Sequence, residues 1–182
     1  FVELPSRGEF YPPDHPFHNQ KMVEIKFMTA KDEDILSSES LLKNGQVVDR
    51  LLESLLVVDV DPSTLLIGDR SALLIAARIS GYGSEYIVDH VCRSCVRKSE
   101  INFDLNNATM FDDCFDDTVL EKEGVEYNSE TQTFDVTLPV TGVRVGMSLL
   151  DGYTERETVM NETEQKKESL VTSTLSMFLS KV

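Results

Sequence analysis

The stretch from residue 29 to residue 83 constrains the fold of this 182-residue chain more than any other segment. It holds most of the apolar residues able to build a core, and they recur at the spacing of a helix face. The spacing predicts one helix over about 46–56 and another over 70–80. Because residues 70–80 have little polar face, we expect the second helix to be the buried centre of the domain.

Capping residues predict where these helices begin and end. Thr29 and Asp32 have the spacing of a capping box, which predicts a short helix that ends near Ser40. Asp69 is the expected N-cap of the helix over 70–80, and Gly81 is the residue expected to end it. Residues 29–84 are therefore expected to form a helical core.

The first 28 residues are expected to form an arm and one strand. Four of the six prolines lie in residues 1–20, which predicts an extended segment over the surface. Every second residue from Val23 to Phe27 is apolar, and this alternation predicts a strand from Met22 to Met28. The residues expected to hold the arm in place are Leu4, Phe10, Tyr11 and Phe17.

From residue 85 onward the pattern changes to strands. Residues 86–91 and 101–105 flank a Cys-x-x-Cys turn, which predicts a hairpin of the zinc-ribbon type over 85–105. Residues 106–133 are rich in Asn, Asp and Glu and predict an acidic loop, and alternating residues predict a second antiparallel hairpin over 134–149. Residues 154–182, Leu179 included, predict a helical region that packs on the core.

Together these segments predict a single domain of the α+β class. It has a helical core (29–84), antiparallel β-hairpins and a C-terminal part (134–182) made of a hairpin and a helical region. One of the hairpins is expected to be half of a zinc ribbon.

Composition limits the classes of function open to the chain. Lys and Arg total 17 against 32 Asp and Glu, a net charge of -15. This charge argues against a nucleic-acid partner; it suits basic protein partners, or it serves solubility alone. No run of about 18 apolar residues is present, so the sequence predicts no membrane span. Three cysteines are too few for a secreted disulfide framework, which favours synthesis in a reducing cytoplasm.

Cys92 and Cys95 are the strongest candidate site. Two thiolates at this spacing can bind one zinc ion, but a structural zinc needs four ligands. The remaining ligands would come from His90, Cys114 or the aspartates at 112–117. Otherwise the two cysteines are a half-site, whose second pair lies outside this segment or has decayed. A redox dithiol is the third interpretation, although such motifs lie at a helix N-terminus and strand-like sequence flanks this one.

The sequence predicts no enzyme. His15 and His18 lie in the proline-rich segment and His90 lies beside the cysteines, without a nucleophile motif such as G-x-S-x-G. Gly81 and Gly83 lie at a helix end, but neither a P-loop nor a dinucleotide fingerprint surrounds them. We therefore expect no catalytic residues and no small-molecule substrate.

Several short phrases, read in chain order, are similar to one protein family. They match over roughly residues 1–105, and more loosely over 134–152. In this order they resemble the baseplate hub proteins of T-even-like contractile-tailed bacteriophages. The phrases are Leu4-Pro5-Ser6-Arg7-Gly8, Phe27-Met28-Thr29-Ala30, Leu41-Leu42-Lys43-Asn44-Gly45, Gly68-Asp69-Arg70, Gly81-Tyr82-Gly83, and Val91-Cys92 with Cys95.

The resemblance implies a structural subunit of the contractile-tail baseplate, in the hub region. Its partners would be other tail and baseplate proteins, and its location the virion tail after synthesis in the host bacterial cytoplasm. The alternative is a hub assembly chaperone that is not retained in the virion. For cofactors the resemblance implies none within this segment, or zinc if a second Cys-x-x-Cys beyond residue 182 completes a four-cysteine site with Cys92 and Cys95.

The two ends of the chain indicate whether such a second pair could lie outside these residues. The sequence does not begin with Met and stops within an amphipathic stretch, so we expect it to be part of a longer protein.

Overall fold

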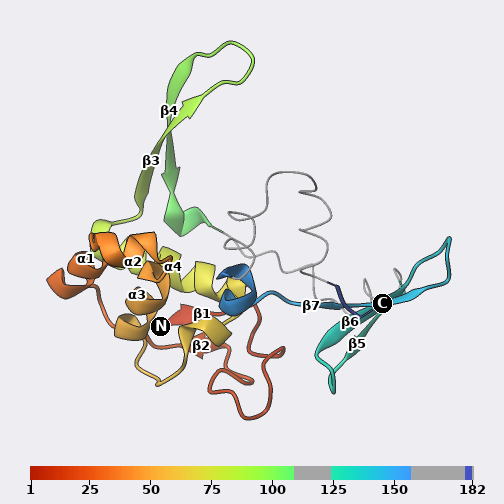
Figure 1. Cartoon of the computed structure of the whole chain (residues 1–182). Coiled ribbons are helices and arrows are strands. Elements are labelled where there is room, and N and C mark those ends of the chain that lie inside the picture. Colours follow the sequence, from red (N-terminus) through yellow and green to blue (C-terminus); the bar gives the residue numbers. More distant parts are fainter. Residues whose placement is uncertain (109–123, 157–178, 182) are drawn as a thin grey trace.

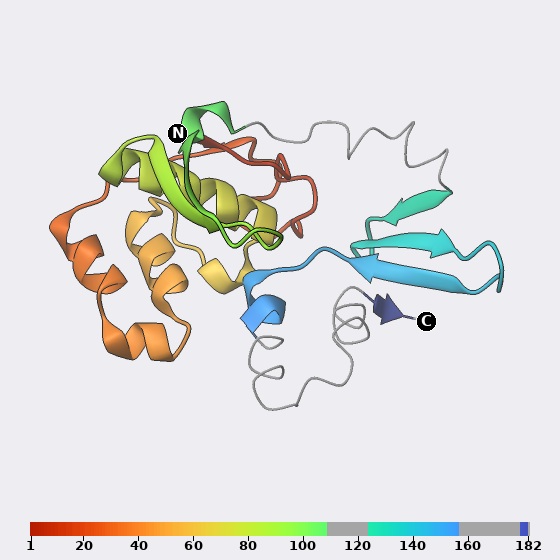
Figure 2. The ribbon, with the colours of Figure 1, turned by 90° about the horizontal axis from the view of Figure 1, so that it is seen from above.

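The computed structural model describes residues 1–108, 124–156 and 179–181. They form a helical body, a long two-stranded hairpin that projects from it, and a small antiparallel sheet (Figure 1). Seen from above, the sheet lies to one side of the body, and the chain runs back from it to residues 150–156 (Figure 2). The α+β class predicted from the sequence is confirmed.

The helical body begins with the predicted capping box. The backbone N–H of Thr29 donates to the Asp32 carboxylate over 2.7 Å. Ser54 donates to the same carboxylate over 2.6 Å and so joins the first helix to the third. The elements of the body are α1 (Ala30–Leu36), α2 (Glu39–Lys43), α3 (Val47–Leu55), the 3-10 turn η1 (Pro62–Thr64) and α4 (Ile67–Tyr82).

The first and last residues of helix α4 differ from those predicted. It begins at Ile67, so Asp69 is not its cap but lies in its first turn, fully buried. It continues through Gly81 and ends where Gly83 takes a φ of 83°, a conformation that favours glycine. Only one face is buried, and Ile75 is 37% exposed. The helix therefore covers the core and is not its enclosed centre.

The proline-rich N-terminal segment is part of the core. Leu4, Tyr11 and Phe17 are buried and belong to one cluster with Leu52 of α3 and Leu73 of α4. The prediction of an extended arm over the surface is therefore wrong, although these three predicted anchors are buried. Burial of a large apolar side chain contributes about 1.5–3 kcal/mol, which favours packing of this segment into the core. Its prolines do not prevent this, because proline is as compatible with the turns seen here as with an extended chain.

Two short strands close this segment. β1 (Val2–Glu3) pairs antiparallel with β2 (Met22–Val23). The predicted strand from Met22 to Met28 is correct only at its start. Ile25 forms a single bridge with Leu56, and Phe27 is 80% exposed. The alternating pattern is therefore buried in its first half only.

The projecting hairpin consists of β3 (Glu85–Val91) and β4 (Lys98–Asp104), followed by the 3-10 turn η2 (Leu105–Asn107). The strands pair antiparallel along their whole length. All of their side chains are exposed or half-buried, and the hairpin stands away from the helices (Figure 1). The predicted hairpin around the Cys-x-x-Cys turn is confirmed.

The small sheet has the strand order β5-β6-β7-β8 with antiparallel neighbours. Its central pair confirms the hairpin predicted over 134–149. The strands are β5 (Val125–Asn128), β6 (Thr133–Thr137), β7 (Arg144–Ser148) and β8 (Leu179–Lys181).

Two predictions for this half of the chain are wrong. Residues 125–128 form a strand where an acidic loop was expected, because Val125 and Tyr127 alternate with polar residues and fit a half-buried sheet. Leu179 lies in strand β8 and not in a helix, since pairing with β7 satisfies backbone groups that would otherwise be left at a sheet edge. The predictions for 109–123 and 157–178 lie outside the described residues.

Aromatic rings and the chain that follows β7 join the sheet to the body. The ring of Phe10 packs against Tyr127 and Phe134, with ring centroids 5.2 Å and 5.5 Å apart. The chain after β7 returns to the start of α4, where the N–H of Ile67 donates to the carbonyl of Leu150 over 3.0 Å. The start of α4 is thus the point where the N-terminal segment, the helices and the chain from the sheet meet.

Candidate functional site

Cys92 and Cys95 lie in the turn at the tip of the β3–β4 hairpin, both as free thiols. The N–H of Cys92 donates to the carbonyl of Arg97 over 3.0 Å, and the N–H of Val96 donates to the carbonyl of Cys92 over 2.9 Å. Hydrogen bonds from the backbone of Cys95 and then of Ser94 lower the pKa of the Cys92 thiol, because they stabilise the thiolate.

This turn does not assemble a metal site from the part of the chain that the structure describes. Within it, no three His, Cys, Asp or Glu side chains are grouped so that they could hold a metal ion. His90 pairs across the hairpin with Ser99, and Cys114 and the aspartates at 112–117 lie outside the described residues. The zinc-ribbon character predicted for the hairpin is therefore not supported. Cys92 and Cys95 lie near each other, but no third ligand is grouped with them in the described residues.

A second polar site, the Asp69 junction, consists of Ser6, Tyr11 and Asp69. The buried Asp69 carboxyl accepts hydrogen bonds from the Ser6 N–H over 2.9 Å, the Ser6 hydroxyl over 2.5 Å and the Tyr11 hydroxyl over 2.8 Å. The Tyr11 oxygen accepts in turn from the N–H of Leu66 over 3.0 Å. Burial and the neighbouring Asp69 charge raise the pKa of Tyr11, so its hydroxyl keeps its proton and remains a donor.

Gly8 gives the N-terminal segment the turn that reaches this junction. Its φ is 75°, and a Cβ atom there would lie 2.4 Å from both the backbone nitrogen of Gln20 and the carbonyl oxygen of Phe17. Its N–H donates to the hydroxyl of Ser6 over 3.0 Å. Only glycine fits this position without moving the backbone.

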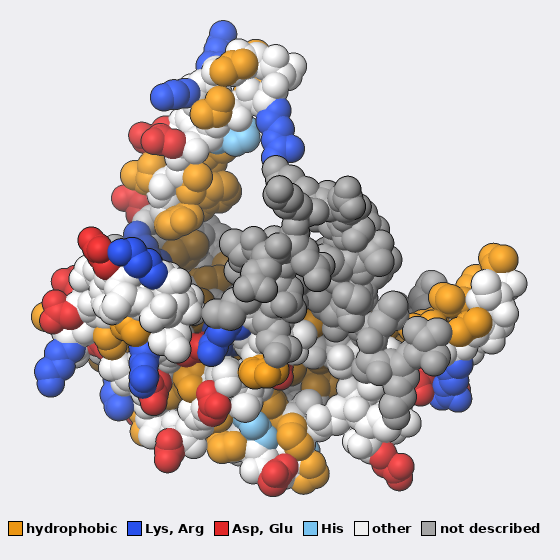
Figure 3. Space-filling view, viewed as in Figure 1, with side chains coloured by type: hydrophobic (Ala, Val, Ile, Leu, Met, Phe, Trp, Pro, Cys, Tyr) orange, Lys and Arg blue, Asp and Glu red, His pale blue; other side chains and the backbone are white. Residues whose placement is uncertain are grey.

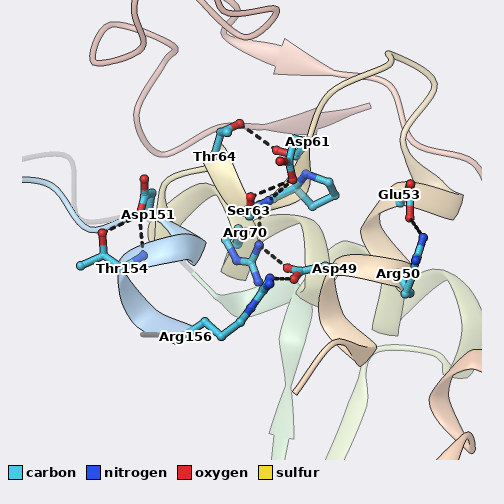
Figure 4. A network of polar contacts seen from close by, with 11 residues as sticks. Asp49, Arg50, Glu53, Asp61, Ser63, Thr64, Arg70, Asp151, Thr154 and Arg156 are labelled. Atoms are coloured by element: carbon cyan, nitrogen blue, oxygen red, sulfur yellow. Dashed lines mark hydrogen bonds and ion pairs between the residues drawn. The ribbon is translucent and has the colours of Figure 1, made fainter. Parts of the chain in front are cut away.

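Arg70, the next residue on α4, organises a network of ion pairs (Figure 4). Its Nη1 lies 2.8 Å from Oδ1 of Asp49 and donates to the carbonyl of Pro62. Arg156 pairs with the other oxygen of Asp49, and a Cβ atom at Gly152 would lie 2.5 Å from Nη1 of Arg70. The buried guanidinium therefore joins α3 and α4 to residues 150–156.

The histidines of the N-terminal segment support the loop that carries Tyr11. His15 stacks on the Tyr11 ring at 4.3 Å between centroids, and its Nδ1 accepts from the N–H of Phe17 over 3.1 Å. Burial lowers the pKa of His15, which favours the neutral ring that this acceptor role requires. His18 Nδ1 lies 2.7 Å from the carbonyl of Tyr11.

The sequence does not predict the Asp69 junction, although two of the phrases behind the family resemblance meet there. Leu4–Gly8 supplies Ser6, and Gly68-Asp69-Arg70 supplies the carboxyl. An acid at the start of a helix is most often a cap, and that expectation hides its role. The signal for a buried polar site in the sequence is the pair Asp69-Arg70, an acidic and a basic residue side by side at the start of an otherwise apolar helix.

The fold and these contacts define a small α+β protein whose buried polar side chains join its own segments and whose hairpin projects from the body. A family model described as T4 bacteriophage base plate protein matches residues 3–174. The chain belongs to this family. Neither the curated proteins nor the solved structures gave a match.

Membership confirms the resemblance at the level of a T4-like phage baseplate protein. The family suggests a structural, non-enzymatic role and implies a place in the virion tail and contact with other tail proteins. Among the residues described, no helix has the length and apolar character needed to cross a membrane.

Proposed function

We propose that this chain is a structural subunit of the contractile-tail baseplate, in its hub region, and that it acts through protein–protein contacts in tail assembly. The observation that carries the proposal is the family match over residues 3–174 of the 182. The hub assignment also uses the phrases that resemble hub proteins, among them Leu4–Gly8 and Gly68-Asp69-Arg70.

The construction of the chain suits a subunit held between neighbours. The Asp69 junction and the Arg70 network fix the body, because each joins segments that are distant in sequence. The β3–β4 hairpin and the sheet extend away from this body and offer surface beyond it (Figures 1 and 2). A fixed body with extended elements gives a small protein access to more than one partner.

The partners that we propose are other tail and baseplate proteins. The net charge of -15 disfavours nucleic acid, and we assign neither a membrane nor a small-molecule substrate. The chain would be made in the host bacterial cytoplasm and act in the virion tail. For Cys92 and Cys95 we propose zinc only if a second ligand pair comes from outside residues 1–182, since a structural zinc needs four ligands.

An assembly chaperone for the hub is the alternative function, because the same surfaces would bind the same partners transiently. Quantitative mass spectrometry of gradient-purified virions separates the two. We expect this chain in finished particles at a constant ratio to other baseplate proteins, and density for it at the hub in electron microscopy of intact tails. Its presence in assembly intermediates and absence from finished particles would establish the chaperone.

A further inference from the structure

One face of the β3–β4 hairpin is apolar, and within the part of the chain that the structure describes its side chains are not enclosed. The register places Tyr86 opposite Phe103 and Val88 opposite Ile101. Residues opposite each other in an antiparallel pair lie on the same face, and alternate residues of each strand share it. These four side chains therefore form one surface, the apolar face of the hairpin. Tyr86, Ile101 and Phe103 are 44%, 39% and 49% exposed.

The acidic side chains of the hairpin lie on the opposite face. Glu85 pairs with Asp104, and Asp89 pairs with Glu100, at positions that alternate with the apolar pairs. Asn102, which shares that second face, donates to the Glu85 carboxylate over 2.5 Å. The two strands therefore contribute no carboxylate to the apolar face.

Basic side chains border the apolar face at both ends. At its base the guanidinium of Arg78 lies 5.9 Å from the ring centre of Tyr86 and 4.9 Å from that of Tyr82. Arg78 also donates to two backbone carbonyls at the end of α4 and the start of β3, which fixes the hairpin on the helix. At the tip, Arg93 and Arg97 are exposed. Figure 3 shows hydrophobic side chains along the hairpin and basic ones near its tip.

These properties indicate which kind of surface would cover the face. A two-stranded hairpin that stands alone is at best marginally stable in water, and monomeric proteins rarely expose a contiguous apolar patch larger than a few hundred Å². A second copy is disfavoured because each chain carries a net charge of -15. An apolar strip with carboxylates at its ends complements both the apolar centre and the basic borders.

We propose that the apolar face of the hairpin is a docking site for an apolar, acid-bordered segment of another baseplate protein. The kind of partner rests on the proposed function. The position of the site and its chemistry rest on the hairpin alone. Tyr86 and Phe103 bury against the apolar part of that segment. Arg78 at the base and Arg93 and Arg97 at the tip pair with its carboxylates.

Site-specific photo-cross-linking in infected cells tests the site directly. The full chain carries p-benzoylphenylalanine in place of Phe103 on the apolar face or, as a matched control, in place of Ile87, which is 53% exposed on the opposite face. We expect a cross-link from position 103 to another baseplate protein, within an apolar segment next to Asp or Glu, and little from position 87. Cross-links to a second copy or within the same chain, equal yields from both positions, or no cross-link would overturn the proposal.

Substitutions test the energetic role of the same face. Phe103→Asp and the pair Arg93→Glu with Arg97→Glu should lower the yield of assembled tails by about tenfold, while Ile87→Asp should leave it unchanged. Purified Phe103→Asp protein should still melt cooperatively, within about 2–4 °C of the wild type, because the side chain is not enclosed. Wild-type tail yield with Phe103→Asp would overturn the proposal. If the chain is absent from finished particles, the structural role fails, but cross-links in assembly intermediates still decide the docking site.

Discussion

The two ends of α4 hold two attachments of opposite character. At its first turn the N-terminal segment is bound through the Asp69 junction, where a buried carboxyl has three hydrogen bonds. Near its C-terminal end Arg78 holds the β3–β4 hairpin, whose side chains are exposed or half-buried. The difference shows that similar apolar and polar residues are buried and stabilise the fold at one end of the helix, and are exposed at the other.

Aromatic residues make the contrast plain. Tyr11 and Phe17 are 3% and 1% exposed, whereas Tyr86 and Phe103 are 44% and 49% exposed. Substitutions around the Asp69 junction should therefore change stability, and substitutions on the hairpin should change assembly.

The largest effect is expected for Asp69→Ala. It leaves the buried hydroxyls of Ser6 and Tyr11 without their acceptor and detaches the N-terminal segment, at a cost of about 3–5 kcal/mol in the free energy of unfolding. Urea unfolding of purified protein measures the change. Asp34→Ala, at an exposed position of α1, is the control and should cost little. Equal stability of the two variants would contradict the role assigned to the junction.

Gly8→Ala should destabilise the same end of the molecule by about 2–4 kcal/mol, because it adds a backbone clash to an unfavourable positive φ. The matched control is Gly45→Ala, where φ is 65° but a Cβ atom would meet nothing within 4 Å. Thermal melting of the two variants separates the clash from the conformational cost. If Gly45→Ala is as damaging as Gly8→Ala, the close packing of the turn is not what matters.

A pH dependence is expected from Asp32. Burial alone would raise the pKa of its carboxyl, but hydrogen bonds from Ser54 and Thr29 outweigh burial and hold the pKa below its ordinary value. Its contribution is therefore full above the unfolded pKa of about 3.9 and is lost as the pH falls through the lower folded pKa. Urea midpoints between neutral and acid pH measure it. Asp32→Asn should be less stable near neutrality and approach the wild type in acid; a constant difference would show that the carboxyl charge is not involved.

Much of the fold could be predicted from local pattern, and the errors have a common physical cause. The capping box at Thr29 and the hairpin around Cys92 and Cys95 depend on neighbours in sequence, and both are present. The burial of Leu4 and the pairing of Leu179 in β8 depend on partners far along the chain. No local pattern specifies such partners, so local pattern predicts a surface arm for a core segment and a helix for a strand.

The candidate sites show the same limit. The Cys-x-x-Cys turn is visible in sequence because its two residues are close together, but spacing alone cannot supply the missing ligands. The Asp69 junction is invisible because Ser6 and Asp69 are 63 residues apart. Each half is recognisable in the sequence only as a family phrase, and the structure shows that the two phrases meet.

Phe103→Ala tests the hairpin side of the comparison. Because the ring is not enclosed, its removal should cost no more than about 1 kcal/mol, whereas Leu4→Ala, at 0% exposure, should cost about 2–5 kcal/mol. Chemical unfolding of both variants gives the two values. A loss for Phe103→Ala as large as that for Leu4→Ala would mean that the hairpin is covered within the chain itself, and the docking proposal would then lose its basis.

The smallest effect is expected for Cys92→Ser. The turn is held by the backbone bonds between Cys92 and Arg97 and between Val96 and Cys92, and serine keeps both. The described residues group no third ligand beside the cysteines, so we expect no metal to leave with the sulfur. The melting temperature should therefore equal that of the wild type, with or without EDTA. A drop in the variant that EDTA reproduces in the wild type would show that residues 1–182 contain the missing ligands, and the hairpin would then owe its stability to zinc.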